Sequence, residues 1–504
     1  MTADTSPAAT DLLARWAEIE DLGAASSLLG WDQETYMPPA GAEGRGRVLG
    51  TLAGIAHQRL CAPELLDAID GAEESAADDV TVAQAREARR LVQRAQRVPE
   101  DLTRALAEAT SRALGVWRAA READDFAAFA DDLERVLHLT RERAAALADG
   151  GKNHYDALLD EYETGATAAR LDELFAGLRA DLVPLLRAVA ASGVTVDESA
   201  ARGSFPVDAQ RALGLEVTAA MGFDFDAGRL DASAHPFCSG LNDRDVRLTW
   251  RWDETDFRPA LLGMMHEAGH GLYEQGLPQR WRRTPLGGAV SLGVHESQSR
   301  LWENLVGRSL PFWRWALPRF QQAFPAQPQT TAEAVWRSLN VVAPSLIRVE
   351  ADEVTYNLHV LARFELEKAL IGGDLGVADL PGAWADTYEE LLGIRPQTAA
   401  EGVLQDIHWS MGAFGYFPTY TIGNLVAAQL FEAAAAELGD LDGAFEAGEF
   451  GGLLDWLRRN VHSEGRRRLP DELVDHATGR PLSSAPFVAR VRTICEQQYG
   501  ITAA

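Results

Sequence analysis

The chain has few cysteines, no long apolar run and no signal-like start. Its three cysteines, Cys61, Cys238 and Cys495, are too few and too widely spaced for a disulfide framework or a paired-cysteine metal site. Such sparse thiols are typical of reducing compartments, so we expect a cytoplasmic location. No stretch of 18 uncharged apolar residues occurs, which predicts no membrane span. The first 25 residues lack a basic start followed by an apolar core, so no signal peptide is expected.

Basic residues are in deficit as well. The chain carries 75 acidic and 47 basic residues, for a formal net charge of −28 at pH 7. Nucleic acids and anionic membrane surfaces bind clustered Lys and Arg, so we expect neither as a partner. An acidic surface keeps a protein soluble and attracts cationic peptides, but it does not identify a substrate.

Helical periodicity dominates what is present. Residues 8–150 and 168–192 place apolar side chains at three- and four-residue spacing, which predicts successive helices. The following region instead suggests short strands at Phe205–Val207, 222–228 and Val246–Trp252. Further helices are expected at 331–343, 346–371, 376–392, 400–413 and 419–438.

These patterns favour a mainly α fold with a small β-sheet near the active site. No repeat of fixed period and no low-complexity linker divides the chain. We therefore expect one large helical domain over residues 1–504. In it a helical half, 1–200, faces a second half, 201–504, across a deep substrate groove.

The stretch His266-Glu267-Ala268-Gly269-His270 is the most informative motif. Histidines four residues apart lie on one face of an α-helix, so both imidazoles reach one metal ion. Glu267 points away from that pair, yet it lies near enough to act on a water that the metal activates. This is the H-E-x-x-H pattern of zinc-dependent peptide hydrolases. The apolar run Leu261–Met265 before it suits a helix buried beneath a cleft.

Glu296, 26 residues after His270, is the expected third ligand. This gap fits a second helix that runs back beside the first, joined by a loop that contains Gly287-Gly288. A carboxylate there completes a His-His-Glu set and leaves the fourth zinc position open, as in catalytic zinc sites. Glu303 is an alternative, because it lies seven residues further along the same helix face. His295 is weaker, because it points ~100° away from Glu296.

Five separated motifs, in order along the chain, resemble the carboxypeptidase Taq family of metallopeptidases. They are Asp245–Thr249, His266–His270, His295–Gln298, Ile347–Asp352 and Gly402–Trp409. Weaker similarity extends over nearly the whole chain, at Trp31–Pro38, Tyr155–Glu163 and His235–Phe237. At Thr164 and Trp250 the chain departs from the pattern of the family. Neither residue is an expected metal ligand, so these departures bear on substrate preference and not on catalysis.

The resemblance implies a zinc metallocarboxypeptidase that releases C-terminal amino acids from peptides with broad specificity. It also implies a gluzincin architecture, similar to neurolysin and angiotensin-converting enzyme. One zinc ion per chain is expected, with cobalt as an alternative metal. Peptides with a free C-terminus are the expected partners, and the family resemblance implies a homodimer.

A set of catalytic roles follows from this ligand set and the resemblance. Glu267 is expected to act as general base and then to deliver the proton to the leaving amine. The oxyanion needs a donor besides the metal, and related helical zinc peptidases use a His and a Tyr. Here His408 and Tyr420 are the candidates, with Tyr416 in reserve. For the carboxylate that orients a zinc histidine, Asp406 and Asp352 are equal candidates.

Carboxypeptidase activity also requires a fixed cation for the free C-terminal carboxylate, and the planar fork of arginine suits it. Arg348, in the Ile-Arg-x-x-Ala-Asp motif, is the first candidate and Arg247 the second. Each has a nearby carboxylate in sequence, Asp352 and Asp245, with which it can form a structural ion pair instead.

Two other functions share these features. A dipeptidase or oligoendopeptidase uses the same zinc chemistry with a differently closed cleft, and a non-catalytic peptide-binding protein uses the same scaffold. The intact Glu267 argues against the latter. An aromatic-rich region is expected in the core rather than at a dimer interface; it comprises Trp281, Trp302, Phe312, Trp313 and Trp315.

Overall fold

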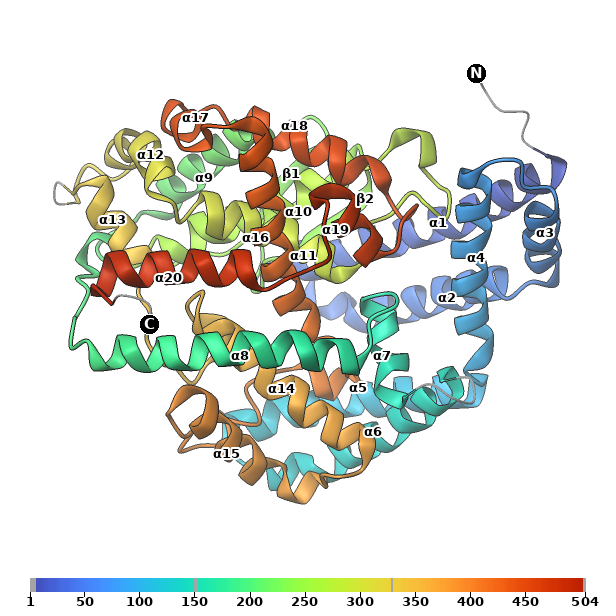
Figure 1. Ribbon diagram of the computed structural model, residues 1–504. Helices are drawn as coiled ribbons and strands as arrows, with labels where there is room; N and C mark the ends of the chain where they lie inside the picture. The colour runs from blue at the N-terminus through green and yellow to red at the C-terminus, as the bar shows by residue number, and fades with distance from the viewer. Residues whose placement is uncertain (1–5, 149–152, 328–329, 502–504) are drawn as a thin grey trace.

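The computed structural model describes residues 6–148, 153–327 and 330–501, and it is mainly helical, as predicted (Figure 1). The first part of the chain forms helix after helix, and all of them except α2 bury apolar side chains. These helices are α1 (Pro7–Thr35), α2 (Ala42–Leu60), α3 (Pro63–Glu74), α4 (Asp79–Arg97), α5 (Glu100–Ala123), α6 (Ala127–Leu147), α7 (His154–Tyr162) and α8 (Ala168–Ala191).

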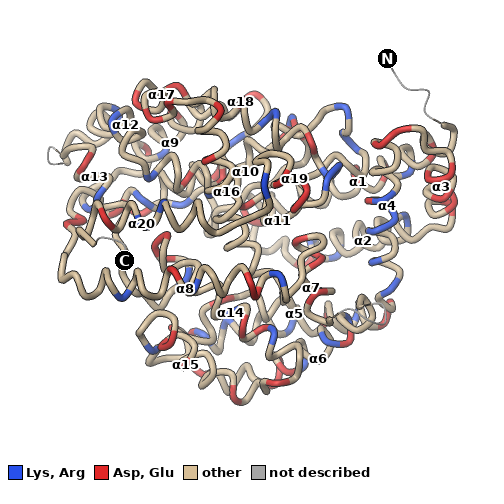
Figure 2. The backbone as a smooth tube through the Cα atoms, viewed as in Figure 1, with Lys and Arg blue, Asp and Glu red and all other residues tan. Residues whose placement is uncertain are grey.

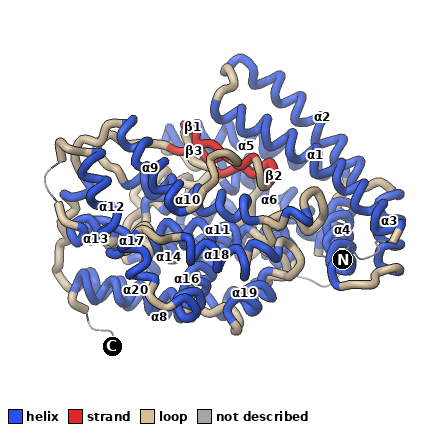
Figure 3. The backbone as a smooth tube through the Cα atoms, turned by 90° about the horizontal axis from the view of Figure 1, so that it is seen from above, coloured by secondary structure: helices blue, strands red, loops and turns tan. Residues whose placement is uncertain are grey.

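Helices α1 and α2 pair as a hairpin that projects from the rest of the molecule (Figure 3). The hairpin is attached through Trp31, whose ring centroid lies 5.1 Å from the guanidinium of Arg229 and 4.2 Å from that of Arg247. The hydroxyl of Tyr36, at the end of α1, donates to Asp231. These contacts fix the base of the hairpin to the small sheet.

The sheet has three strands in the order β1-β3-β2. Strand β1 (Gly228–Ala232) runs parallel to β3 (Asp245–Trp250), and β2 (Cys238–Asn242) pairs antiparallel with β3. Because β3 packs against α10 (Arg258–Gly276), the sheet covers one side of the helix that bears the histidine motif.

Two strand predictions were wrong. Phe205–Val207 forms no strand, because Pro206 is the N-cap of helix α9 (Val207–Met221), where its fixed φ favours helix initiation. The segment 222–228 is mostly a turn: Gly222 ends α9 with a φ of 104°, and only Gly228 belongs to β1.

The second part of the chain holds the remaining helices. They are α10 (Arg258–Gly276), α11 (Leu292–Arg300), α12 (Leu310–Ala323), α13 (Ala332–Leu339), α14 (Thr355–Gly372), α15 (Leu380–Leu392), α16 (Pro418–Leu438), α17 (Leu441–Ala447), α18 (Gly451–Asn460), α19 (Pro470–Thr478) and α20 (Ala485–Tyr499). Helix α11 continues directly into a π-helical turn, η4 (Leu301–Val306).

Two helix predictions also need correction. The helix expected at 346–371 begins only at Thr355, because the Asp352 carboxylate accepts hydrogen bonds from the backbone N–H groups of Val354 and Thr355 and so caps α14. The helix expected at 400–413 is a series of turns that includes the short 3-10 helix η7 (His408–Met411). Gly412, with a φ of 70°, ends η7 in the left-handed region.

Figure 1 shows two layers of helices with α8 between them. One layer holds α9–α13 and α16–α20; the other holds α5, α6, α14 and α15. Helix α16 packs against α11 and α20 in the first layer and α14 in the second, so it links the two. The aromatic-rich region lies in the core, as predicted: Trp302, Trp313 and Phe312 are fully buried.

Acidic and basic side chains are interspersed over both layers (Figure 2). On α4, for example, Arg89 pairs with Asp70 and Glu73 of α3. None of the described helices is long and apolar enough to cross a membrane.

Candidate active site

Helix α10 carries the two histidines of the motif on one face. The rings of His266 and His270 lie 4.9 Å apart, centroid to centroid. Gly269, between them, allows a close approach: a Cβ atom there would lie 2.6 Å from the carbonyl oxygen of Gln298 and the Cα of Ser299 on α11. A larger residue would push α11 away, so the glycine of the motif sets the spacing of the two helices.

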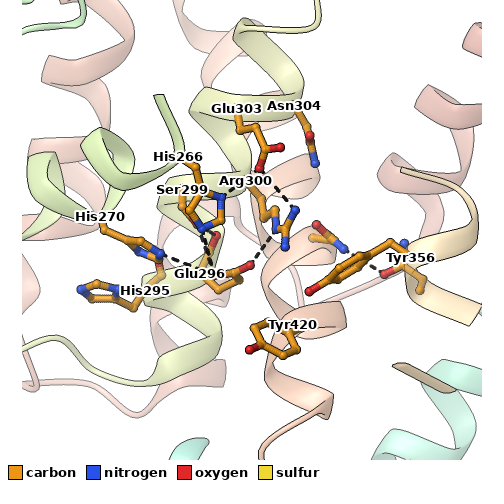
Figure 4. A network of polar contacts seen from close by, with 12 residues as sticks. His266, His270, His295, Glu296, Ser299, Arg300, Glu303, Asn304, Tyr356 and Tyr420 are labelled. Atoms are coloured by element: carbon orange, nitrogen blue, oxygen red, sulfur yellow. Dashed lines mark hydrogen bonds and ion pairs between the residues drawn. The ribbon is translucent and has the colours of Figure 1, made fainter. Parts of the chain in front are cut away.

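Glu296 on α11 completes the cluster that the sequence predicts (Figure 4). Its Oε2 atom lies 3.8 Å from Nε2 of His266 and 3.6 Å from Nε2 of His270. One atom from each of these three residues lies within 4.8 Å of the others. Glu296 is confined from behind by Gly423 of α16, where a Cβ would lie 2.7 Å from the Glu296 Cβ.

The outer nitrogen of each histidine is held by a hydrogen bond. Nδ1 of His270 lies 3.0 Å from the carbonyl oxygen of His295, and Nδ1 of His266 lies 2.9 Å from Oε2 of Glu303. A carbonyl only accepts, so Nδ1 of His270 carries the proton and its Nε2 presents a lone pair. Although burial opposes it, the charge of Arg300 lowers the pKa of Glu303 well below its usual range, so Glu303 also acts as an acceptor.

Glu303 therefore occupies the role proposed for Asp352 or Asp406, and both of those predictions were wrong. Asp352 caps α14, and Asp406 pairs with Arg348 and Arg363. Glu303 was identified from sequence only as an alternative ligand.

The three donors fit a divalent metal of the zinc type. Two imidazole nitrogens and one carboxylate oxygen converge, which is the donor set of catalytic zinc sites. Burial opposes protonation of both histidines; it lowers the pKa of His270 well below its usual range. In His266 burial also lowers the pKa, but the charge of Glu296 and the hydrogen bond and charge of Glu303 together outweigh it, and the pKa is raised.

Glu267, between the histidines in sequence, is buried, with 6% of its surface exposed. Burial raises its pKa to about 7, and the charge of Glu296 acts in the same direction. A carboxyl group with a pKa near neutrality is suited to accept and return a proton.

His408 and Tyr420 lie together, with Nε2 of His408 3.3 Å from the hydroxyl of Tyr420. The ring of Tyr416 lies 5.4 Å from that of Tyr420 and 5.2 Å from that of His408. Burial, and then the charge of Arg348, lower the pKa of His408 to about 3, so its ring is neutral. Burial raises the pKa of Tyr420 well above its usual range, so its hydroxyl keeps its proton.

The loop that bears His408 is anchored by Glu367 of α14, a buried carboxyl that the sequence reading missed. It accepts hydrogen bonds from Nε1 of Trp409 at 2.8 Å, from the backbone N–H of Gly415 at 2.9 Å and from the hydroxyl of Tyr155 at 2.7 Å. No periodicity in the sequence points to these partners, because they come from two segments, one with Tyr155 and one with Trp409 and Gly415, that lie far from each other in the sequence.

Arg348 is buried beside this loop. Its Nη2 donates to Asp406 at 2.8 Å and its Nη1 to the Tyr356 hydroxyl at 3.1 Å, and its guanidinium lies 5.0 Å from the Tyr420 ring centroid. Arg363 also donates to Asp406, through Nε at 2.6 Å. Two guanidinium groups thus share one carboxylate, which leaves one positive charge unneutralised.

Arg247, the second candidate, lies on β3. Its Nε donates to Asp245 at 2.9 Å, which forms the structural ion pair considered from the sequence, and its guanidinium stacks on Trp31 of α1. Its charge is therefore neutralised one to one, unlike that of Arg348.

A cavity of about 540 Å³ lies beside the cluster of His266, His270 and Glu296. Its lining includes Glu20, Arg90 and Tyr162 from the N-terminal helices and Glu274, Ser291 and His295 from the second part of the chain. His295 stacks on His270, with centroids 4.5 Å apart, which brings the cavity next to the histidine pair. Nε2 of His295 lies 2.9 Å from Oε1 of Glu274, so His295 is not one of the three converging donors.

The chain is similar over nearly its whole length to known metallopeptidases. The carboxypeptidase Taq (M32) metallopeptidase family matches residues 11–494. The chain is 46% identical to thermostable carboxypeptidase 1 of Thermus thermophilus over 97% of this chain and 98% of that one, and 38% identical to carboxypeptidase 1 of Bacillus subtilis over 94% of both. The crystal structure of the M32 carboxypeptidase of Deinococcus radiodurans superimposes with a TM-score of 0.95 at 40% identity, covering 98% of this chain and 100% of that one.

Proposed function

Because the chain belongs to the carboxypeptidase Taq (M32) family of metallopeptidases and is a metallocarboxypeptidase, we propose that His266, His270 and Glu296 hold its metal. Two imidazoles and one carboxylate favour zinc, with cobalt as an alternative, and one ion per chain. The observation that carries this proposal is the convergence of three donor atoms within 4.8 Å. A divalent metal bound there supplies Lewis acidity, which makes water a better nucleophile and polarises the scissile carbonyl.

Glu267 is the general base in this proposal. Its buried carboxylate accepts a proton from the attacking water and then passes it to the leaving amine. Its pKa of about 7 supports both steps, because the carboxyl gains and loses a proton near neutral pH.

His408 and Tyr420 stabilise the oxyanion of the tetrahedral intermediate. Tyr420 keeps its hydroxyl proton and is therefore a hydrogen-bond donor. Neutral His408 holds that hydroxyl through the 3.3 Å contact at its Nε2. Tyr416, whose ring packs against both, is the alternative donor.

Arg348 binds the free C-terminal carboxylate of the substrate. Three of its five N–H groups are used by Asp406 and Tyr356, so two remain for a ligand. The shared carboxylate of Asp406 leaves the cluster one positive charge, which a substrate carboxylate neutralises. Contacts link Arg348 to the metal cluster through Tyr356 and Arg300, which in turn holds Glu296. Arg247 is the second candidate.

Product mapping tests this function. The protein is incubated with an unblocked decapeptide and with its C-terminally amidated twin, with and without o-phenanthroline. We expect stepwise loss of single C-terminal residues from the free acid, slow attack on the amide, and recovery of activity when zinc is added after chelation. Internal cuts would identify an oligoendopeptidase. An intact decapeptide together with hydrolysis of a dipeptide substrate would identify a dipeptidase, and binding without cleavage of either would identify a peptide-binding protein.

Three further features belong to the same proposal. Residues 1–504 act as one domain, in which the two halves, 1–200 and 201–504, form the walls of the substrate groove. A continuous core from Ala113 to Tyr499 joins the two halves and supports this, while α1, α3 and α4 have a smaller core of their own. The three unpaired cysteines support a cytoplasmic location. The family resemblance supports a homodimer, which light scattering coupled to size-exclusion chromatography would test.

A further inference from the structure

Arg300, the last residue of α11, touches both carboxylates of the cluster (Figure 4). Its Nε donates to Oε1 of Glu296 at 2.7 Å, and its Nη1 donates to Oε2 of Glu303 at 3.3 Å. The face of its guanidinium lies 4.5 Å from the ring centroid of Tyr356. Three partners therefore fix this side chain, of which only 15% is exposed.

The contact with Glu296 separates the two oxygens of that carboxylate. Oε2 is the atom that faces both histidine nitrogens, whereas Oε1 faces the Arg300 guanidinium. A carboxylate binds a metal through one oxygen or through both. Oε1 is held by a charge-assisted hydrogen bond, whereas Oε2 accepts only a longer bond, 3.3 Å from the Ser299 hydroxyl. Oε2 is therefore the oxygen that Glu296 presents to a metal.

The contact between Arg300 and Glu303 affects His266, another of the three proposed ligands. Glu303 orients His266 through Nδ1, and Arg300 donates to the same Oε2 atom. One guanidinium thus contacts Glu296 directly and also contacts Glu303, the partner of His266. The fork of arginine allows this geometry, whereas the point charge of lysine does not.

A second cation near the cluster provides a contrast. Arg308 donates to Oε1 of Glu303 at 3.3 Å and to Asn304 and the Leu339 carbonyl. None of the contacts described for Arg308 involves Glu296. Arg308 therefore places a positive charge beside Glu303 without holding Glu296. A π-helical turn begins directly after Arg300, at Leu301, and such turns are frequent at functional sites.

We propose that Arg300 is a positioning residue that limits Glu296 to one-oxygen coordination and holds Glu303 against His266. A metal held by one oxygen of Glu296 and by the two histidines would have three protein donors and would keep a position free for water, as catalytic zinc sites do. This inference rests on the proposed function, since it requires His266, His270 and Glu296 to bind the metal.

Metal binding and cobalt spectroscopy test the proposal without relying on activity. The variants are Arg300→Met, Arg300→Lys and the control Arg308→Met, each measured as the full-length protein. Zinc dissociation constants come from competition with a chromogenic chelator, and visible absorption of the cobalt-loaded protein reports coordination number.

We expect Arg300→Lys and Arg300→Met to weaken zinc binding about tenfold or more and to lower the cobalt absorption intensity, as a further oxygen joins the metal. Arg308→Met is expected to leave the cobalt spectrum unchanged. Wild-type spectra and affinities in both Arg300 variants would overturn the proposal. A wild-type spectrum in Arg300→Lys with a changed spectrum in Arg300→Met would also overturn it. That result would show that a positive charge at this position, without the fork of arginine, keeps Glu296 in place.

A second measurement needs no variant and remains decisive if Arg300→Met fails to fold. The zinc K-edge absorption spectrum of the wild-type protein is expected to show a carboxylate bound through one oxygen, and a two-oxygen carboxylate would overturn the proposal. A wild-type protein that binds less than one metal ion per chain, or that binds it undiminished after His266→Ala, would instead contradict the proposed metal ligands.

Discussion

The Nδ1 atom of His266 lies 2.9 Å from Oε2 of Glu303, which follows it by 37 positions in the sequence. This contact orients the first histidine of the motif and directs its Nε2 toward Glu296. Hydrogen-bonded carboxylates of this kind fix the ring of a metal-binding histidine and raise its basicity. Metal affinity should therefore depend on a residue outside the three donors.

Glu303→Gln tests this dependence. We expect zinc affinity to fall ~10–100-fold, because a neutral amide neither orients the imidazole as strongly nor raises its basicity. Competition with a chromogenic chelator measures the change. Asp352→Asn is the matched control: its amide oxygen still caps α14, but the acceptor for the Thr355 hydroxyl and the Ala343 N–H is lost. The melting temperature should therefore fall while zinc affinity stays within about twofold. Equal affinities in wild type and Glu303→Gln would refute this role.

Glu267→Gln separates metal binding from proton transfer. Because Glu267 is not among the three converging donors, the variant should keep one zinc ion per chain while kcat falls ~10²–10⁴-fold. Metal analysis and peptide hydrolysis on the same sample measure both. Glu274→Gln is the control, since Glu274 contacts His295 instead. If kcat of Glu267→Gln stays within tenfold of wild type, another residue is the base.

Arg348→Met and Arg247→Met decide between the two candidates for the carboxylate anchor. Losing a buried cation opposite a carboxylate costs ~3 kcal/mol, or about 100-fold in kcat/KM. We expect this loss for Arg348→Met on free-acid peptides and a much smaller loss on amidated ones. The fold should survive, because Arg363 still pairs with Asp406.

The comparison is made on the ratio of kcat/KM for the free acid to that for the amide. A ratio that collapses in Arg247→Met and stays at the wild-type value in Arg348→Met would reverse the assignment. Unchanged ratios in both would show that neither residue recognises the C-terminus.

Glu163 gives a prediction about stability and pH. It is buried and accepts a 2.9 Å hydrogen bond from the backbone N–H of Gly293, next to the start of α11. Burial raises its pKa from 4.5 to about 7, so the folded state binds its proton more tightly than the unfolded state. Stability from this group is present below pH 4.5 and is lost as pH rises through about 7.

The full shift corresponds to ~3 kcal/mol, or ~3 °C in melting temperature for a chain of this size. Glu163→Gln removes the titration. Relative to wild type, its melting temperature should therefore increase by about that amount between pH 5 and pH 8. Parallel curves for the two proteins across this range would contradict the assignment.

Local sequence patterns predicted the elements that carry the site. Helical spacing placed α8 and α16 to within one residue of their observed ends, and the histidine spacing together with Glu296 identified the three residues that converge. These succeed because helix periodicity and side-chain direction are local properties.

The wrong predictions lie where helix capping sets the start of a helix or where contacts between distant segments set the role of a side chain. Pro206 starts a helix where apolar neighbours suggested a strand, and the Asp352 carboxylate delays α14 by about two turns. The role of Glu303 depends on how α11 lies against α10, and Glu367 contacts segments far apart in sequence. Arg300 had a local signal, a glutamate four residues before an arginine on one helix, but that spacing indicates only an ordinary surface pair.

The ligand set is tested most directly by anomalous diffraction at the zinc edge from crystals of the zinc-loaded protein. The account predicts one anomalous peak per chain, at coordination distance from Nε2 of His266, Nε2 of His270 and Oε2 of Glu296, with Glu303 bonded to His266 rather than to the metal. A peak elsewhere in the chain, or one coordinated by Glu303 in place of Glu296, would contradict it.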